Sequence, residues 1–352
     1  MFDLMFISLD IMCLLYFYYK ILQIKYIKKI ESKIIKHLIS IGICLILFSI
    51  SFIKLYAIPI IYVHVFIFML IFDIIFYFIN KNREKKYYKY NFIAIGLSFV
   101  YILISLFLGL SVYKKTYDIN TLKSISNLKI AQISDSHIGN TIDGDKFIEY
   151  IKKIDKENVD LLVITGDFVD DDTKKEDMVK SCYALSLINT KYGVYFVYGN
   201  HDRGYYSYRD FNTSDLENEL IKNNVKILVD EYVMFDEFCL IGRNDKKYPR
   251  KNMDLLLTGI DTNKYMILLD HQPADYENEK GKVDLVLSGH THGGNLFPAH
   301  LFISFLNDQV YGKKEIDNTT FIVSSGISDW GMPFKNFCNN EYVIINIVGR
   351  KW

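Results

Sequence analysis

Five short polar segments each follow a short apolar run, and this pattern constrains the fold more than any other feature of the 352-residue chain. The apolar runs KIAQIS, LLVIT, VYFVY, MILLD and LVLS are typical of buried β-strands. The segments after them are Asp135-Ser136-His137, Gly166-Asp167, Gly199-Asn200-His201-Asp202, His271 and Gly289-His290-Thr291-His292. Because open α/β sheets build their sites just past the carboxyl ends of neighbouring strands, we expect these side chains to converge on one point.

The segments contain five of the eight histidines of the chain, with Asp and Asn but no Cys. Such a mixed set of oxygen and nitrogen donors suits Mn, Fe or Zn better than an all-oxygen Ca or Mg site. Seven residues supply the donors: Asp135, His137, Asp167, Asn200, His271, His290 and His292. Seven donors with one shared carboxylate fit two divalent ions, and Asp167 can bridge them through its two oxygens. Two ions about 3.5–4 Å apart activate water and hold the attacking and leaving oxygens of a phosphoryl displacement.

Charge and hydropathy divide the chain near residue 112. Residues 1–112 carry 12 Lys and Arg against 5 Asp and Glu, and the remainder has the opposite balance, although the formal net charge is zero. The first part holds four apolar stretches, at roughly 2–19, 37–55, 57–79 and 91–112, each long enough to cross about 30 Å of hydrocarbon. Residues 1–112 are therefore predicted to be a four-helix transmembrane anchor.

The distribution of Lys and Arg predicts the orientation of this anchor in the cell membrane. Positive charges gather between spans one and two and between spans three and four, where they include Lys81, Arg83, Lys85, Lys86 and Lys89. Loops rich in Lys and Arg stay in the cytoplasm, so both chain ends and residues 113–352 are expected to be extracytoplasmic. Lys114 and Lys115, just after the fourth span, oppose this orientation.

Two ionisable residues, His64 and Asp73, lie within the third apolar stretch. Such residues are either functional or buried inside the helix bundle with a hydrogen-bonding neighbour. Because the other stretches offer few polar residues to complete a pathway, we expect the second role.

The second part alternates strand and helix patterns before its strands become consecutive. Residues 113–127 are expected to form a polar linker, and the catalytic domain to occupy 128–352. Helices are predicted at 144–156, 173–189 and 214–223, and strands after them at 225–229, 231–235, 238–242, 265–270, 284–288, 319–324 and 341–347. Alternation followed by a run of strands favours two packed sheets flanked by helices. The absence of a basic stripe argues against a nucleic-acid partner.

Taken in order, the polar segments resemble the calcineurin-like metallophosphoesterase superfamily, in particular a membrane-attached bacterial branch. The family pattern DxH, GDxxD, GNHD, a later His and GHxH is matched here over about residues 128–347. The resemblance implies a four-layer α/β/β/α sandwich. It assigns Asp135, His137, Asp167 and His292 to one metal, and Asp167, Asn200, His271 and His290 to the other. It also implies that His201 contacts the phosphate and acts on the leaving oxygen, oriented by Asp170.

Protein serine/threonine phosphatases of the same superfamily carry arginines that grip phosphate after GDxxD and before GNH. This chain has Asp171 and Tyr198 at those places, which argues against a phosphoprotein substrate. Arg203, Arg243 and Arg250 are candidate replacements because Arg binds phosphate in a bidentate way. We single out Arg243, beside a strand end, and Arg203 as predicted substrate contacts.

Residues 296–306, LFPAHLFISFL, are unusually apolar for a segment that follows a metal-binding loop. They could touch the bilayer and present lipid-borne substrates. We expect instead a buried connection within the core, as is usual for such apolar segments.

The leading hypothesis is a membrane-anchored dimetal hydrolase of a phosphodiester, pyrophosphate or phosphomonoester, with a lipid or envelope substrate among the options. The alternatives are a non-catalytic sensor or binding module that reuses the fold, and a four-helix transporter with an accessory domain. Loops around the site decide the substrate, so the sequence leaves this choice open.

Overall fold

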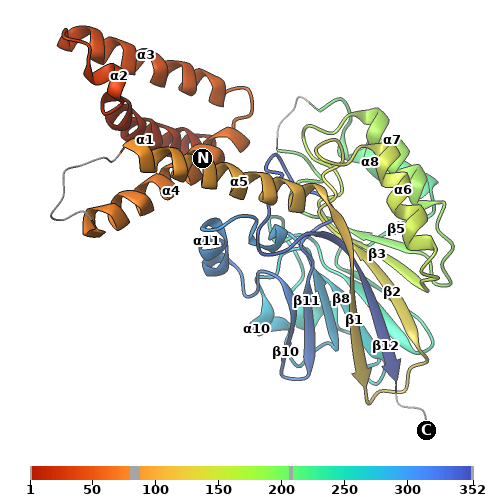
Figure 1. Ribbon diagram of the computed structural model, residues 1–352. Helices are drawn as coiled ribbons and strands as arrows, with labels where there is room; N and C mark the ends of the chain where they lie inside the picture. The colour runs from red at the N-terminus through yellow and green to blue at the C-terminus, as the bar shows by residue number, and fades with distance from the viewer. Residues whose placement is uncertain (1, 80–87, 206–208, 350–352) are drawn as a thin grey trace. The chain divides into compact units, whose positions relative to one another are not determined.

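The computed structural model describes residues 2–79, 88–205 and 209–349 (Figure 1). The chain divides into two compact units, residues 1–107 and 108–352.

The first unit is helical. Its elements are α1 (Phe2–Leu22), α2 (Lys25–Lys28), α3 (Lys33–Ser51), α4 (Ala57–Ile79) and most of α5 (Tyr88–Leu110). Four of these helices, α1, α3, α4 and α5, are long and apolar enough to cross a membrane. They coincide with the four predicted stretches to within a few residues at each end.

The ionisable residues of α4 have partners inside this unit. Asp73 pairs with Lys20 and accepts a hydrogen bond from the Tyr16 hydroxyl at 2.6 Å. His64 is buried, and its Nδ1 donates to the Ile60 carbonyl oxygen at 2.6 Å. The expectation that both residues hydrogen-bond within the bundle is confirmed. Of the positive residues that predict the orientation, Lys81, Arg83, Lys85 and Lys86 lie outside the described residues.

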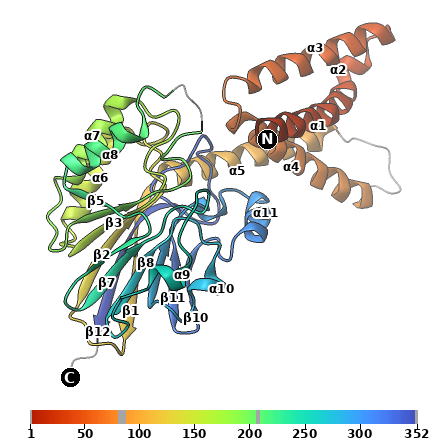
Figure 2. The same cartoon turned by 180° about the vertical axis from the view of Figure 1, so that it is seen from behind.

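The second unit contains two six-stranded sheets (Figure 2). The first sheet has the order β1-β12-β2-β3-β4-β5, with β1 (Val112–Thr121), β12 (Asn340–Gly349), β2 (Leu128–Ile133), β3 (Leu161–Thr165), β4 (Val194–Val197) and β5 (Val225–Ile227). The second has the order β10-β11-β9-β8-β7-β6, with β10 (Gly312–Ile316), β11 (Thr319–Val323), β9 (Leu285–Ser288), β8 (Tyr265–Leu269), β7 (Phe238–Gly242) and β6 (Glu231–Met234). Strands β2, β3, β4 and β5 are parallel, as are β7, β8, β9 and β11.

Helices cover the outer faces of both sheets. The first sheet packs on α6 (Gly144–Asp155), α7 (Lys175–Leu185) and α8 (Thr213–Lys222), and the second on the short α9 (Met253–Leu256) and α10 (Tyr276–Glu279). Side chains of one strand alternate between layers: in β3, Leu162 and Ile164 face the helices while Leu161 and Val163 face the other sheet. This alternation is the period of two expected for strands buried on both faces. The predicted α/β/β/α sandwich is confirmed.

Residues 113–127 are not the polar linker that the sequence suggested. Residues 112–121 form β1, which pairs in parallel with β12 over ten residues. Only Ile119 of this strand is buried, because β1 is an edge strand whose outer side is solvated. Charged residues such as Lys114 and Lys115 are therefore compatible with a strand here. Because they interrupt the apolar pattern typical of a buried strand, the sequence favours a linker at these positions.

The prediction of a buried connection at 296–306 is also wrong. Residues Ala299–Leu306 form helix α11, and none of them is buried. The preceding short 3₁₀ helix η1 (His292–Gly294) begins at the predicted ligand His292. In Figures 1 and 2, α11 stands off from both sheets.

Candidate metal centre

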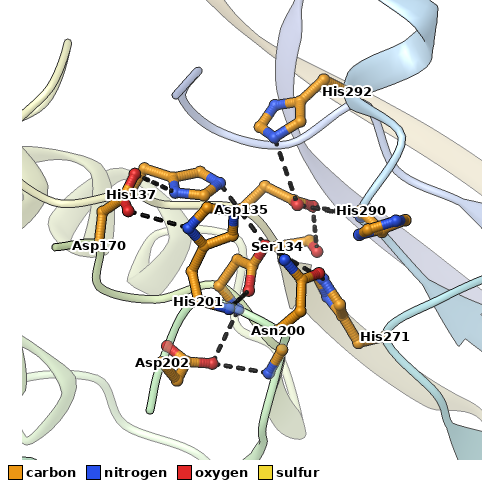
Figure 3. Close-up of polar contacts among 12 residues, drawn as sticks. Ser134, Asp135, His137, Asp170, Asn200, His201, Asp202, His271, His290 and His292 are labelled. Atoms are coloured by element: carbon orange, nitrogen blue, oxygen red, sulfur yellow. Dashed lines mark hydrogen bonds and ion pairs between the residues drawn. The ribbon is translucent and has the colours of Figure 1, made fainter. Parts of the chain in front are cut away.

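The predicted ligands meet where strands of the two sheets end (Figure 3). Asp135 and His137 follow β2, Asp167 follows β3, and Asn200 follows β4 in the first sheet. Three histidines follow β8 and β9 of the second sheet: His271, His290 and His292. Five of the seven have the positive φ that non-glycine residues rarely adopt, namely Asp135, His137, Asp167, His290 and His292. Backbone strain of this kind concentrates at functional sites.

One group of donors comprises Asp135, His137 and His292, whose ligand atoms lie within 4.8 Å of one another. His292 Nε2 is 3.6 Å from Asp135 Oδ1. The Asp135 carboxylate also accepts hydrogen bonds from the His290 backbone N–H at 3.0 Å, which fixes it relative to the loop after β9.

A second group comprises Asp167, His271 and His290. His271 Nε2 lies 3.2 Å from Asp167 Oδ2 and 3.2 Å from Asn200 Oδ1, so the amide oxygen belongs to the same group. The same Asp167 Oδ2 is 3.7 Å from His137 Nε2. One carboxylate oxygen is therefore close to an imidazole of each group.

These separations fit metal coordination. Two donors that each lie about 2.1 Å from one ion are about 3–3.5 Å apart. His137 Nε2 is buried without a hydrogen-bond partner among the described residues, an arrangement that a bound cation would satisfy. His271 donates its Nδ1–H to the Thr165 carbonyl oxygen at 2.8 Å, which leaves Nε2 as the donor atom directed at Asp167 and Asn200. The seven predicted ligands can thus hold two ions.

His201 and His137 share one carboxylate. Asp170 accepts from His201 Nδ1 at 2.9 Å and from His137 Nδ1 at 3.0 Å. Both bonds hold the rings so that Nε2 points away from Asp170. The His201 side chain remains 19% exposed, whereas that of His137 is fully buried. His201 can therefore reach a bound molecule, while His137 Nε2 faces the Asp167 carboxylate.

Burial and charge shift the pKa values of the imidazoles in opposite directions. Burial opposes protonation of His137, but the carboxylates of Asp170, Asp167 and Asp135 outweigh it and raise its pKa to about 9. For His290, burial, together with the charge of His271, lowers the pKa to about 3. Burial would raise the pKa of Asp170, but hydrogen bonds from His137 and His201 hold it well below its usual range.

Two features that support the site carry no metal donor. The buried Asp202 carboxylate accepts backbone hydrogen bonds from Asp167, Phe168 and Val169 at 2.8–3.1 Å and from Gly199 at 2.7 Å, which ties the loops after β3 and β4 together. Gly199 itself lies so close to Asp167 that a Cβ would overlap its carboxylate. A side chain at this position would displace the central ligand.

The structure corrects the prediction that Arg243 contacts substrate. Its guanidinium is 3% exposed, and Nη1 pairs with three carboxylates at 2.7–3.1 Å, those of Asp270, Asp275 and Glu279. Arg250 joins the same network through Asp270 and Asp275. These arginines are committed to internal ion pairs, which the sequence could not reveal because their partners lie 20–36 residues away.

Arg203 stays a prediction. Its guanidinium lies between two aromatic rings, 4.2 Å from the Tyr198 centroid and 4.4 Å from that of Tyr248. Stacking of this kind holds the guanidinium plane without using its N–H groups as ion-pair donors.

Asp329 and Lys335 contribute to the site and were missed by the sequence prediction. Asp329 Oδ1 is 3.3 Å from His292 Nδ1 and 3.5 Å from the Nζ of Lys335, a lysine that is fully buried. A carboxylate behind a metal-binding imidazole orients the ring and raises its basicity. The signal available was position: Asp329 follows β11, as the ligands follow other strands.

Comparisons with known proteins agree with this arrangement. The family described as calcineurin-like phosphoesterase matches residues 128–294. An uncharacterized metallophosphoesterase of Aquifex aeolicus is 32% identical over 253 residues, which cover 68% of this chain and 93% of that protein. An uncharacterized metallophosphoesterase of Campylobacter jejuni is 31% identical over 245 residues, covering 67% of this chain and 63% of that protein.

A bovine protein named transmembrane protein with metallophosphoesterase domain is 32% identical over 237 residues. The match covers 60% of this chain and 51% of the bovine protein. The chain thus spans less than two thirds of the bovine and Campylobacter relatives.

Proposed function

Because this chain belongs to the calcineurin-like phosphoesterase family, we propose that it is a membrane-anchored phosphoester hydrolase that uses two divalent ions. The observation that carries the proposal is the position of Asp167 Oδ2, 3.2 Å from His271 Nε2 and 3.7 Å from His137 Nε2. One carboxylate between two groups of imidazoles is what two ions with a common ligand require.

The seven donors would be shared between the two ions. Asp135, His137, Asp167 and His292 would hold one, while Asp167 with Asn200, His271 and His290 would hold the other. When bound, Mn, Fe or Zn ions supply Lewis acidity toward the phosphoryl group and lower the pKa of water to near neutrality. Asp170 and Asp329 keep the ligands His137 and His292 oriented from behind.

His201 is the proposed general acid. Hydrolysis forms a bond from a water oxygen to phosphorus and breaks the ester P–O bond, so the leaving oxygen needs a proton. Asp170 holds His201 Nδ1, which leaves Nε2 to deliver that proton from the exposed side of the ring. A carboxylate behind an imidazole stabilises its protonated form against nearby cations.

Four apolar helices anchor the proposed enzyme in the membrane. The Lys and Arg distribution favours an extracytoplasmic position for the catalytic unit. The bovine relative's name is consistent with a membrane-bound member of the family. Phosphodiesters, pyrophosphates and phosphomonoesters are all candidate substrates, because the proposed centre acts on the phosphoryl group that they share.

Metal-dependent hydrolysis by the full-length chain in detergent tests this function. We would assay bis(p-nitrophenyl) phosphate, p-nitrophenyl phosphate and inorganic pyrophosphate with Mn, Zn, Fe(II) and Mg. We expect Asp167→Asn to lower the rate at least about 10³-fold because it weakens both metal positions.

The matched control is Asp254→Asn, which makes the same change in an aspartate whose side chain is 82% exposed. It should hydrolyse the esters at the native rate. Equal rates for Asp167→Asn and the native chain would refute the proposed centre. Two bound ions without turnover of any ester would favour the non-catalytic binding module instead.

A further inference from the structure

Helix α11 carries an apolar surface that the proposed reaction does not use. Leu301, Phe302, Phe305 and Leu306 lie on one side of this helix, and Phe305 and Leu306 are 85% and 78% exposed. His300 and Ile303, on the opposite side, are only partly exposed. Among the described residues of 108–352, three of the four most exposed large apolar side chains belong to this helix. Such a concentration marks an interaction surface.

A neighbouring segment packs against the other side of α11. Phe337 is 53% exposed, and its ring centroid lies 4.2 Å from that of His300. The backbone N–H of Phe297 donates to Asn336 Oδ1 at 3.2 Å, and the N–H of Asn336 donates to the Asn295 carbonyl oxygen at 3.2 Å. Residues 336–337 therefore hold α11 from the side opposite its apolar face. That face, made of Leu301, Phe302, Phe305 and Leu306, is called the α11 surface below.

The same segment holds the point where the fourth apolar helix ends. Gly109, in the last turn of α5, lies against Pro333 so closely that a Cβ would overlap the Pro333 carbonyl. Its own carbonyl oxygen accepts a hydrogen bond from the Asn340 side chain. Residues 333–340 thus contact both the end of α5 and the segment that holds α11 within one compact unit.

The length of α5 locates this point relative to a bilayer. Its 21-residue apolar span, Tyr90–Leu110, is about 31 Å long, which matches the hydrocarbon thickness of about 30 Å. Leu110 would then lie at the bilayer interface, two residues before β1 begins at Val112. The segment that holds α11 therefore also contacts the chain at the point where α5 would leave the hydrocarbon.

We propose that the α11 surface docks into the bilayer interface and that the phosphoester hydrolysed is carried on a membrane lipid. An amphipathic helix that lies in the interface buries its apolar face at the depth of the headgroups. Metal donor His292 is only seven residues before Ala299, and a Cβ on Gly294 would overlap His300 of α11. Docking therefore fixes the metal centre close to headgroup phosphates. The substrate half of the proposal rests on the proposed function, whereas the docking half does not.

Quenching by brominated phosphatidylcholine tests the docking independently of activity. The full-length chain would be reconstituted with Trp introduced by Phe305→Trp or, as a control on α8, by Ile221→Trp, at a residue that is 62% exposed. After subtraction of the native Trp signal, we expect clear quenching for Phe305→Trp and none for Ile221→Trp. Equal quenching of the two variants would overturn docking.

A ratio of rates tests the substrate class. Phe302→Ser with Phe305→Ser should lower hydrolysis of a lipid phosphoester in vesicles about tenfold and leave a soluble nitrophenyl ester within about twofold. The lipids would be phosphatidic acid, phosphatidylglycerol and a polyprenyl pyrophosphate, and Ile221→Ser is the matched control.

Each outcome of this assay is decisive. An equal loss on both substrates would mean that α11 supports the fold of the centre and would overturn lipid presentation. If the native chain hydrolyses the soluble ester but none of the lipids, only the proposal of a lipid substrate would be overturned. Failure of the native chain on every ester would refute the proposed function, while the quenching experiment would still decide docking.

Discussion

Asp270 and His271 are consecutive residues after β8, yet they belong to two different buried clusters of charged groups. The clusters differ in the distances between their oppositely charged atoms. Around Asp270, the nitrogens of Arg243 and Arg250 approach carboxylate oxygens to 2.7–3.1 Å. Around His271, imidazole and carboxylate atoms lie 3.2–3.7 Å apart, and His137 Nε2 has no hydrogen-bond partner among the described residues.

The difference separates a cluster whose charges are already paired from one whose geometry fits a bound ion. Distances of 2.7–3.1 Å are those of direct charge-assisted hydrogen bonds. Separations above 3 Å between donor atoms suit atoms that share an ion. Burial and charge are common to both clusters, so neither property alone identifies a functional site. The arginine cluster should therefore govern stability, and the histidine cluster metal binding and catalysis.

Substitution of Arg243 by Met should separate these roles most clearly. Removing the cation leaves buried carboxylates unpaired, which costs about 3–5 kcal/mol of unfolding free energy. Metal content of the folded fraction should not change. Thermal unfolding in detergent and metal analysis of the same sample measure the two effects.

The control for this substitution is Lys222→Met, which removes an exposed pair with Glu219 and should cost no more than about 1 kcal/mol. Loss of metal from Arg243→Met at unchanged stability would contradict the division between the two clusters.

His201→Gln should impair catalysis without emptying the centre. We expect kcat to fall about 10²–10³-fold, the usual contribution of a general acid, with both ions retained. The loss should be larger for an alkyl ester than for a nitrophenyl ester, since nitrophenolate leaves without a proton. Steady-state rates on the two esters provide the measurement. An equal loss on both, or a loss of metal, would assign His201 another role.

Sequence reasoning located the histidine cluster because its information is local. Each donor follows an apolar run, and short motifs such as that of Asn200 and His201 carry the family resemblance, which the comparisons confirm. Parallel strands then bring the ends of distant runs together. The strand predicted at 238–242 coincides with β7. Every residue of this strand is buried, so its short apolar run is itself a local signal.

The failures share a dependence on contacts that are distant in sequence. The carboxylates that pair with Arg243 lie 27–36 residues away in the sequence. Its position beside a strand end is therefore equally compatible with a phosphate contact and with a buried ion pair. β1 was hidden because an edge strand needs only one apolar residue, Ile119, facing the core. The composition of α11 predicted burial, whereas its side chains are exposed.

Asp329→Asn tests whether the carboxylate next to His292, which belongs to none of the sequence motifs, increases the affinity of the centre for metal. The substitution keeps the size of the side chain but removes the charge behind His292, so metal affinity should fall about 10–100-fold. Competition with a fluorescent chelator would measure the affinity for Mn. Asp308→Asn is the control, because that carboxylate accepts from the Tyr276 backbone N–H in a different part of the unit. Equal affinities for the two variants would show that Asp329 does not support the ligand.

Proton release on metal binding offers the finest distinction between the two clusters. A ligating imidazole must be neutral, but carboxylates overcome the effect of burial and raise the pKa of His137 to about 9 and that of His271 well above its ordinary value. Below pH 9 His137 must lose a proton to bind metal, and the raised pKa of His271 means that this ring gives up a proton on binding as well. His290, with its pKa lowered to about 3, is already neutral. Metal binding to chelator-treated protein at pH 7 should therefore release about two protons, and the affinity for metal should rise with pH until the pH approaches 9.

Calorimetry in buffers of different ionisation enthalpy measures this release. Binding without proton release would mean that the carboxylates near His137 and His271 do not hold protons on these rings in the metal-free protein.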